Sequence, residues 1–188
     1  MIRSVCVFCG SAPGARPSYS RAAEEMGVAL AKAGLTLVYG GGKLGLMGIV
    51  ADAALNAGGR VVGVIPRMLI ERECAHPRLT TQHVVNTMHE RKTLMADMSD
   101  AFVGLPGGMG TFDELVEIIT WAQLGLHAKP VILANIDNYF APLYGMLDNA
   151  VQEKFVTAES RSRWRNADSV ASVMGILAKE GVTGDGIP

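Results

Sequence analysis

Residues 105–114 read Leu-Pro-Gly-Gly-Met-Gly-Thr-Phe-Asp-Glu and join an apolar run to a helix-like run through three glycines. Glycine lets the main chain adopt positive φ angles and approach a ligand closely. The first turn of a helix also carries unpaired N–H groups and the positive end of the helix dipole. The junction therefore predicts an anion site, with phosphate as the expected anion.

Short β-branched runs alternate with longer helical patterns on both sides of this junction. The patterns predict strands over residues 4–9, 35–39, 60–65, 82–85, 101–105 and 131–134. They predict helices over residues 18–33, 46–57, 88–98, 111–124, 139–153 and 168–180, three of them ended by Gly34, Gly58 and Gly181. This order is typical of an α/β fold with a doubly wound, Rossmann-like parallel sheet, apolar on both faces and covered by helices on both. We expect a single domain over 1–180 and a flexible tail over 181–188.

Three of the predicted strands run directly into glycine, at Gly10, at Gly40 and at Pro106-Gly107. A glycine in any one of these junctions has an ordinary explanation, because strand-to-helix turns often need positive φ. Ligands of parallel sheets, however, lie beyond the carboxyl ends of the strands. The three junctions together therefore predict one shared pocket.

The second junction, Gly40-x-Gly42-x-x-Gly45, matches the dinucleotide-binding spacing. The next strand ends in Val64-Ile65-Pro66-Arg67 and lacks the acid that would hold a ribose diol, which argues against a nicotinamide enzyme. Lys43 is not followed by the Ser or Thr of a P-loop, which argues against ATP hydrolysis. The remaining prediction is a pocket for a nucleoside monophosphate, with no metal and no cofactor specified.

Charge and cysteine content narrow the class of protein. The chain has 188 residues, 17 basic and 18 acidic, and no basic stripe, so nothing favours nucleic acid or a membrane as partner. No signal-peptide pattern opens the sequence, and we expect a cytoplasmic protein. Cys6-x-x-Cys9 lies along a strand pattern, which points the two thiols to opposite faces and favours buried structural cysteines over a redox or zinc pair. Cys74-Ala75-His76 lies in a polar loop, and we expect no metal site there.

An arginine interrupts the apolar stripe of the helix predicted over 88–98. Met88, Arg91, Met95 and Met98 share one helical face. A buried guanidinium needs a carboxylate, a carbonyl or a bound anion, so Arg91 is a candidate ligand-binding residue; the alternative is an arginine that extends to solvent or pairs internally. Lys92 leaves that face and reads as a solvated charge.

Glu114 has two interpretations. In the first, Thr111 is the N-cap of the helix predicted over 111–124 and Glu114 completes a capping box. In the second, Glu114 is a carboxylate held ionised near the helix start, which suits a site where positive charge develops on a sugar ring. Glu117, one turn later, either orients Glu114 or simply suits the helix dipole.

These residues resemble the LONELY GUY family, the cytokinin riboside 5′-monophosphate phosphoribohydrolases, whose signature Pro-Gly-Gly-x-Gly-Thr-x-x-Glu is complete at 106–114. Further family-like blocks lie at 6–11, 38–42, 45–48, 63–66, 88–92 and 120–125. The resemblance implies hydrolysis of the N-glycosidic bond of an N6-substituted adenine nucleotide or AMP, with Arg91 and Glu114 at the catalytic positions and no cofactor. An older family label, lysine decarboxylase, is not supported by any pyridoxal-lysine setting in the sequence. The alternative is a carrier or sensor that binds a nucleotide without chemistry.

The resemblance also implies the substrate-binding set and the assembly. The expected substrate-binding residues are Gly10, Ser11, Gly41, Gly42, Met88, Lys92, Pro106, Gly107, Gly108, Gly110, Thr111 and Glu117. Family members form homodimers, and the helix of Glu114 carries Trp121 beside a core stripe; the alternative is that Trp121 packs within its own subunit. Asn138 and Ala141 depart from the family pattern, which leaves the preference for a prenylated base over plain AMP open.

Overall fold

The computed structural model describes residues 1–71 and 74–182, and these form one parallel sheet with helices on both sides. Within this part of the chain the sheet has seven strands in the order β4-β3-β2-β1-β5-β6-β7. The strands are β1 (Ser4–Phe8), β2 (Thr36–Tyr39), β3 (Val61–Pro66), β4 (Thr81–Val85), β5 (Ala101–Gly104), β6 (Val131–Ala134) and β7 (Trp164–Ala167). The doubly wound α/β fold expected from the sequence is confirmed.

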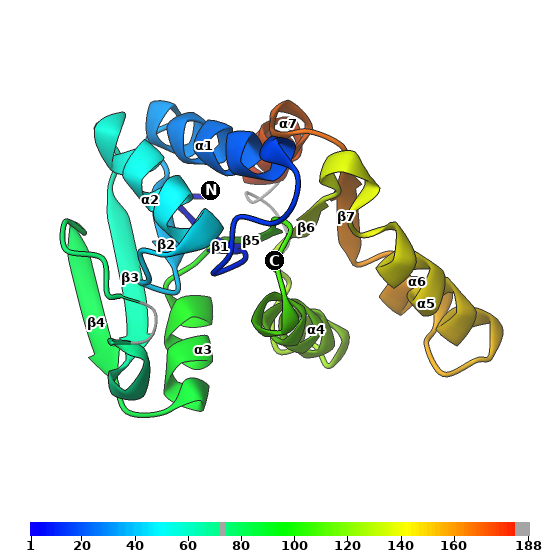
Figure 1. The fold of residues 1–188 in the computed structure, drawn as a ribbon. Coiled ribbons are helices and arrows are strands. Elements are labelled where there is room, and N and C mark those ends of the chain that lie inside the picture. Colours follow the sequence, from blue (N-terminus) through cyan, green and yellow to red (C-terminus); the bar gives the residue numbers. More distant parts are fainter. Residues whose placement is uncertain (72–73, 183–188) are drawn as a thin grey trace.

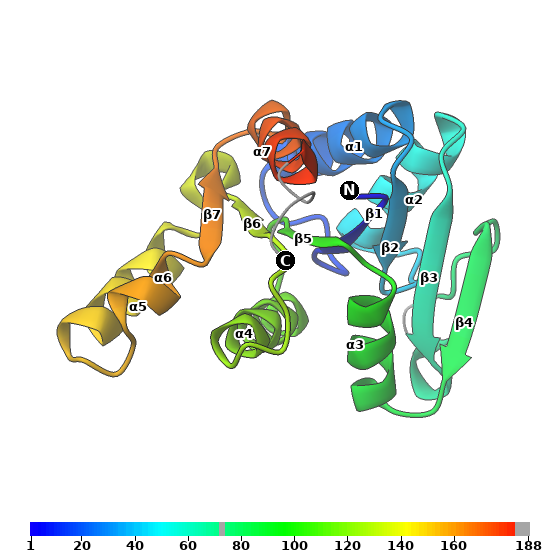
Figure 2. The same ribbon diagram turned by 180° about the vertical axis from the view of Figure 1, so that it is seen from behind.

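The helices form two layers (Figures 1 and 2). One layer holds α1 (Pro17–Lys32), α2 (Gly45–Asn56) and α7 (Val170–Val182), and the other holds α3 (Met88–Asp97), α4 (Met109–Gln123) and α5 (Ala141–Gln152). The short α6 (Ala158–Arg161) and two 3₁₀ turns, η1 (Arg67–Leu69) and η2 (Ile136–Asn138), complete the described elements. Together α5 and α6 extend beyond the β7 edge of the sheet (Figure 1).

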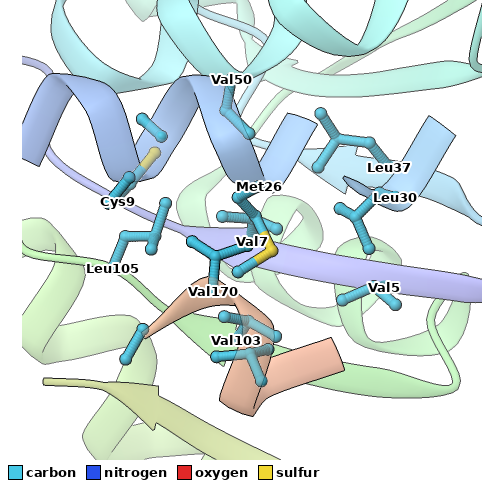
Figure 3. Packing of buried hydrophobic residues seen from close by; sticks show 14 of the residues in the cluster. Val5, Val7, Cys9, Met26, Leu30, Leu37, Val50, Val103, Leu105 and Val170 are labelled. Carbon is cyan, nitrogen blue, oxygen red and sulfur yellow. The ribbon is translucent and has the colours of Figure 1, made fainter. Parts of the chain in front are cut away.

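Alternate residues of β1 supply the two cores. Val5, Val7 and Cys9 pack with α1 and α2 on one face, as Figure 3 shows, whereas Cys6 and Phe8 belong to the core under α3 and α4. The prediction that Cys6 and Cys9 point to opposite faces is therefore confirmed. All strands except the two at the edges are almost fully buried, as strands under two helical layers must be.

The edge strands correct two expectations. β4 alternates between half-buried and exposed residues, so it is not apolar on both faces. β7 was not predicted because its middle residues, Arg165 and Asn166, are exposed and polar, and only its two ends are buried. An edge strand pairs on one side only and needs less apolar sequence, which weakens its signal.

The start of α4 and the end of α7 differ from the sequence prediction. α4 starts at Met109 with Gly108 as N-cap, so Thr111 is not the cap, and no side-chain capping bond is made there. The capping-box interpretation of Glu114 is wrong. Gly34 and Gly58 adopt positive φ just after α1 and α2, as predicted. Gly181 does not end α7, which continues to Val182; residues 183–188 of the predicted tail lie outside the described part of the chain.

Candidate active site

The strand order reverses between β1 and β5, and the loops that follow these two strands meet at this point. The Gly10 N–H donates to the Pro106 carbonyl at 3.1 Å. A Cβ on Gly107 would lie 2.7 Å from the Gly10 nitrogen and 2.1 Å from the Thr111 hydroxyl oxygen, so only glycine allows the two loops to approach this closely. Two of the three glycine junctions therefore form one site, at the edge where ligands of such sheets bind.

A cavity of about 130 Å³ opens between these loops and α3. Its lining combines backbone from both loops with the side chains of the two candidate catalytic residues: Cys9, Gly10, Ser11, Met47, Arg91, Gly108, Met109, Gly110, Thr111 and Glu114. The N-terminus of α4 lies in this wall, and its free N–H groups and dipole favour an anion. Thr111 is buried against Gly107 and adds a hydroxyl to the same wall.

Arg91 is only 4% exposed, and two backbone carbonyls fix its guanidinium. Its Nε donates to the Val64 carbonyl at 3.2 Å and its Nη2 donates to the Gly40 carbonyl at 3.0 Å. A Cβ at Gly40 would lie 2.1 Å from Nη2, so this glycine makes room for the guanidinium. Arg91 thus pairs internally with carbonyls of β3 and of the turn after β2, which was one of the alternatives, and it also lines the cavity; it does not extend to solvent.

The negative charge of Glu114 affects the pKa of two buried cysteine thiols. Burial raises the pKa of the Cys9 thiol well above its usual range, and the negative charge of Glu114 raises it further. The same two causes, in the same order, raise the pKa of Cys6. Both thiols therefore stay protonated beside the cavity, and neither is activated as a nucleophile.

Lys92 does not line this cavity and is not the solvated charge that the sequence suggested. Its Nζ lies 3.0 Å from Glu117 Oε1 and 3.2 Å from Asp113 Oδ2, and its side chain is 12% exposed. Burial lowers the pKa of this ammonium, but the hydrogen bonds to Glu117 and Asp113 outweigh burial and raise it overall. Lys92 and Glu117 share a second, small cavity with Glu114, which takes them away from the glycine loops.

Three further expected binding residues lie outside the cavity lining. Gly41 and Gly42 are buried under a strap from the 74–76 segment: the Gly41 carbonyl accepts from His76 N–H, and Gly42 bridges to Ala75. Gly41 and Gly42 therefore contribute to this strap and to the turn between β2 and α2, and Gly41 has a positive φ of 79°. Met88 lies behind the site, where its sulfur accepts a 4.0 Å contact from Arg91 Nη1.

Sequence reasoning missed an adjoining pocket of about 250 Å³. It shares Gly10, Ser11 and Gly108 with the first cavity, includes the expected residues Pro106 and Gly107, and is walled by Tyr19, Leu46 and Tyr139 among others. The Tyr139 hydroxyl donates to the Gly107 carbonyl and so ties the start of α5 to the glycine loop. Two aromatic residues that follow strand ends were the available signal, but nothing local links them to the loop.

Within residues 1–71 and 74–182, no three His, Cys, Asp or Glu side chains are grouped so that they could hold a metal ion. His76 is buried and contacts Asp52 and the Arg78 backbone; burial lowers its pKa despite the nearby carboxylate. None of the described helices has the length and apolar character that crossing a bilayer requires.

Known proteins are similar to this chain over most of its length. The family model described as "Possible lysine decarboxylase" matches residues 47–177, more than half of the chain. The cytokinin riboside 5′-monophosphate phosphoribohydrolase of Rhodococcoides fascians is 51% identical over 162 residues, which cover 86% of this chain and 82% of that protein. The phosphoribohydrolase LOG of Oryza sativa subsp. japonica is 49% identical over 159 residues, covering 85% of this chain and 66% of that protein.

Among solved structures, the molybdenum cofactor carrier protein MCP from Chlamydomonas reinhardtii superposes with a TM-score of 0.73 at 19% identity, covering 97% of this chain and all of that one. This likeness concerns the fold alone. The family match and the relatives near 50% identity are stronger evidence than the shared fold. They show that the chain belongs to the family that includes the cytokinin riboside 5′-monophosphate phosphoribohydrolases.

Proposed function

We propose that this protein hydrolyses the N-glycosidic bond of an adenine nucleoside 5′-monophosphate, with an N6-substituted (cytokinin) base as preferred substrate, and releases free base and ribose 5-phosphate. One observation carries the proposal: Arg91 and Glu114 line the same cavity as the glycine-rich start of α4. Glycine-rich backbone, a cation and a carboxylate thus line one cavity of about 130 Å³, which adjoins the pocket of about 250 Å³. Relatives near 50% identity carry this activity in their names.

The chemistry divides between the two side chains. The phosphate binds the N–H groups of Gly108, Gly110 and Thr111 at the helix start, which directs the ribose toward Glu114. As the bond from C1′ to the base breaks, its electron pair goes to the base and positive charge develops on the sugar ring. Glu114 stabilises that charge and takes a proton from the water that attacks C1′. The departing base takes its proton from solvent.

Arg91 remains protonated and therefore cannot act as the general acid. Its guanidinium is fixed by two carbonyls, so it offers a preorganised positive charge to the departing base or to the phosphate. This arrangement favours catalysis over simple carriage, because a carrier has no need of a carboxylate beside the sugar. A pyridoxal enzyme would need a neutral lysine amine, whereas Lys92 is held as an ammonium by two carboxylates.

The preference for an N6-substituted base over AMP depends on the residues around the base. Asn138 and Ala141, where this chain departs from the family pattern, flank Tyr139 at the start of α5. Tyr139 walls the pocket next to the reaction cavity. Competition between isopentenyladenosine 5′-monophosphate and AMP measures the preference directly.

We also propose a homodimer in the cytoplasm. On α4 and the turn after it, Val116, Leu124 and Leu126 are 49%, 67% and 69% exposed, which is unusual for large aliphatic residues on one short segment. Trp121 on the same helix is half-buried. Cys6, Cys9 and Cys74 are free thiols, which suits a reducing compartment.

The test incubates purified protein with isopentenyladenosine 5′-monophosphate or AMP and separates free base from nucleotide by chromatography. Glu114→Gln is expected to lower kcat by about 10²- to 10⁴-fold, because it removes the base and the negative charge and keeps the shape. Arg91→Ala is expected to weaken both binding and turnover. Circular dichroism confirms that each variant is folded. Intact nucleotide after incubation with wild-type protein would instead favour the carrier.

A further inference from the structure

Three carboxylates, those of Asp113, Glu114 and Glu117, lie on the second and third turns of α4. Asp113 precedes Glu114 directly, and Glu117 follows it by three residues, on the neighbouring turn. Like charges three residues apart share a helix face and repel, so Glu117 makes it harder for Glu114 to stay ionised, whereas the adjacent Asp113 points to another face and acts from farther away. The proposed reaction needs Glu114 ionised, and a positive charge that pairs with its acidic neighbours favours the ionised form.

Lys92 supplies this positive charge from α3, which lies in the same helical layer as α4. Its ammonium lies 3.2 Å from Asp113 and 3.0 Å from Glu117, so it contacts both acids that flank Glu114. The contact with Glu117 is sheltered, because Phe8, Ile118 and Trp121 line the same small cavity as Lys92, Glu114 and Glu117, whereas the Asp113 side chain is 57% exposed. In such a setting solvent screens the ammonium less than on an open surface.

The position of Lys92 in the sequence links this contact to the reaction cavity. Arg91, its neighbour on α3, donates hydrogen bonds to the carbonyls of Val64 in β3 and of Gly40 just after β2. Lys92 therefore extends toward α4 from a fixed point. The two successive residues together set how the acidic face of α4 lies relative to the guanidinium.

We propose that Lys92 is a positioning residue for this reaction, which keeps Glu114 in place and ionised by pairing with Asp113 and Glu117, and that it does not bind the substrate. This inference rests on the function proposed above. Within the described residues 1–71 and 74–182, the guanidinium of Arg91 and the buried thiols of Cys6 and Cys9, which stay neutral, also lie near Glu114.

Lys92→Met tests the inference by removing the charge and keeping an unbranched apolar chain. It is expected to lower kcat about 10- to 100-fold with KM nearly unchanged, because it disturbs the reacting group and not the phosphate cradle. The acidic limb of the pH–activity profile is expected to move up by about one pH unit. Lys92→Arg should retain most activity. Adding Asp113→Asn and Glu117→Gln to Lys92→Met should return the acidic limb toward its wild-type position.

Lys32→Met is the matched control, since it removes the same charge from the exposed end of α1. It should leave kcat and the pH profile unchanged. A rise in KM with an unmoved acidic limb would overturn the proposal and assign Lys92 to substrate binding. Lower thermal stability with normal kcat per folded molecule and an unmoved limb would also overturn it, in favour of a merely structural ion pair.

A second readout does not depend on turnover. In protein labelled with ¹³C at the glutamate carboxyls, the Glu114 signal is assigned by its loss in Glu114→Gln and followed by NMR as a function of pH without nucleotide. Lys92→Met should raise its titration midpoint by about one pH unit. An unmoved midpoint refutes the role of Lys92, whereas absence of hydrolysis by wild-type protein refutes only the proposed function.

Discussion

Gly40 illustrates how one residue without a side chain controls a charged group. Its carbonyl accepts from Arg91 Nη2, and its α-carbon leaves the space that the guanidinium occupies. The neighbour that a Cβ would meet is the end of a flexible side chain and not backbone. A substitution here can therefore be accommodated by the fold, but only by moving Arg91.

We predict that Gly40→Ala lowers kcat/KM about tenfold or more, because a displaced guanidinium no longer faces the nucleotide, and also lowers the melting temperature, because the buried guanidinium loses its hydrogen bonds to two carbonyls. Steady-state kinetics and thermal denaturation measure the two effects. Gly145→Ala is the control: it lies in α5 with open space around its α-carbon, and it should raise stability by about 0.5–1 kcal/mol without affecting turnover. Wild-type kinetics in Gly40→Ala would show that the position of Arg91 is not critical.

At the scale of elements, Asp100 joins the start of β5 to the start of β1. Its Oδ2 accepts from the N–H groups of Arg3 and Ser4 at 2.8 and 3.0 Å and from the Ser4 hydroxyl at 3.1 Å. Burial raises the pKa of this carboxyl, but these hydrogen bonds outweigh burial and lower it overall. A lowered pKa means that the ionised form stabilises the fold at neutral pH.

We predict that Asp100→Asn destabilises the protein by about 1–2 kcal/mol at pH 7, because an amide oxygen accepts these bonds more weakly than a carboxylate. The pKa of Asp100 is lower in the folded chain, so its contribution is complete above about pH 4–5 and is lost as the pH falls further. Urea unfolding of both proteins between pH 3 and pH 8 (about the range that brackets this transition) measures the difference. Exposed Asp97→Asn serves as control, and a difference that persists at the acid end would contradict the assignment.

At the scale of the whole molecule, the exposed aliphatic residues on α4 and the following turn are expected to be covered by a second copy of the chain. We predict that Leu124→Glu combined with Leu126→Glu shifts the protein from dimer to monomer, because two carboxylates would have to be desolvated at the interface. Sedimentation velocity measures the assembly. Exposed Met146→Glu on α5 is the control. A monomeric wild-type protein would refute the proposed dimer.

The sequence itself predicts the order of the first six strands and of the six longer helices, and it predicts an anion-binding junction before α4. Alternating apolar periods and strand-to-helix glycines are local signals, and the helical patterns singled out Arg91 and Glu114, which line one cavity in the structure. The resemblance around 106–114 added the chemistry. Lys92 and the start of α4 were misjudged because their settings depend on contacts between segments that are distant in the chain.

Tertiary structure alone decided which groups meet. Neither the pairing of Lys92 with acids on another helix nor the contact of Tyr139 with the glycine loop has a sequence signal, because each joins elements brought together only by the sheet order. The same holds for β7, whose polar middle forms a strand because β6 offers unpaired backbone groups beside it. Local backbone preferences and burial patterns can therefore be predicted from the sequence, whereas the packing of distant segments decides which side chains share a site.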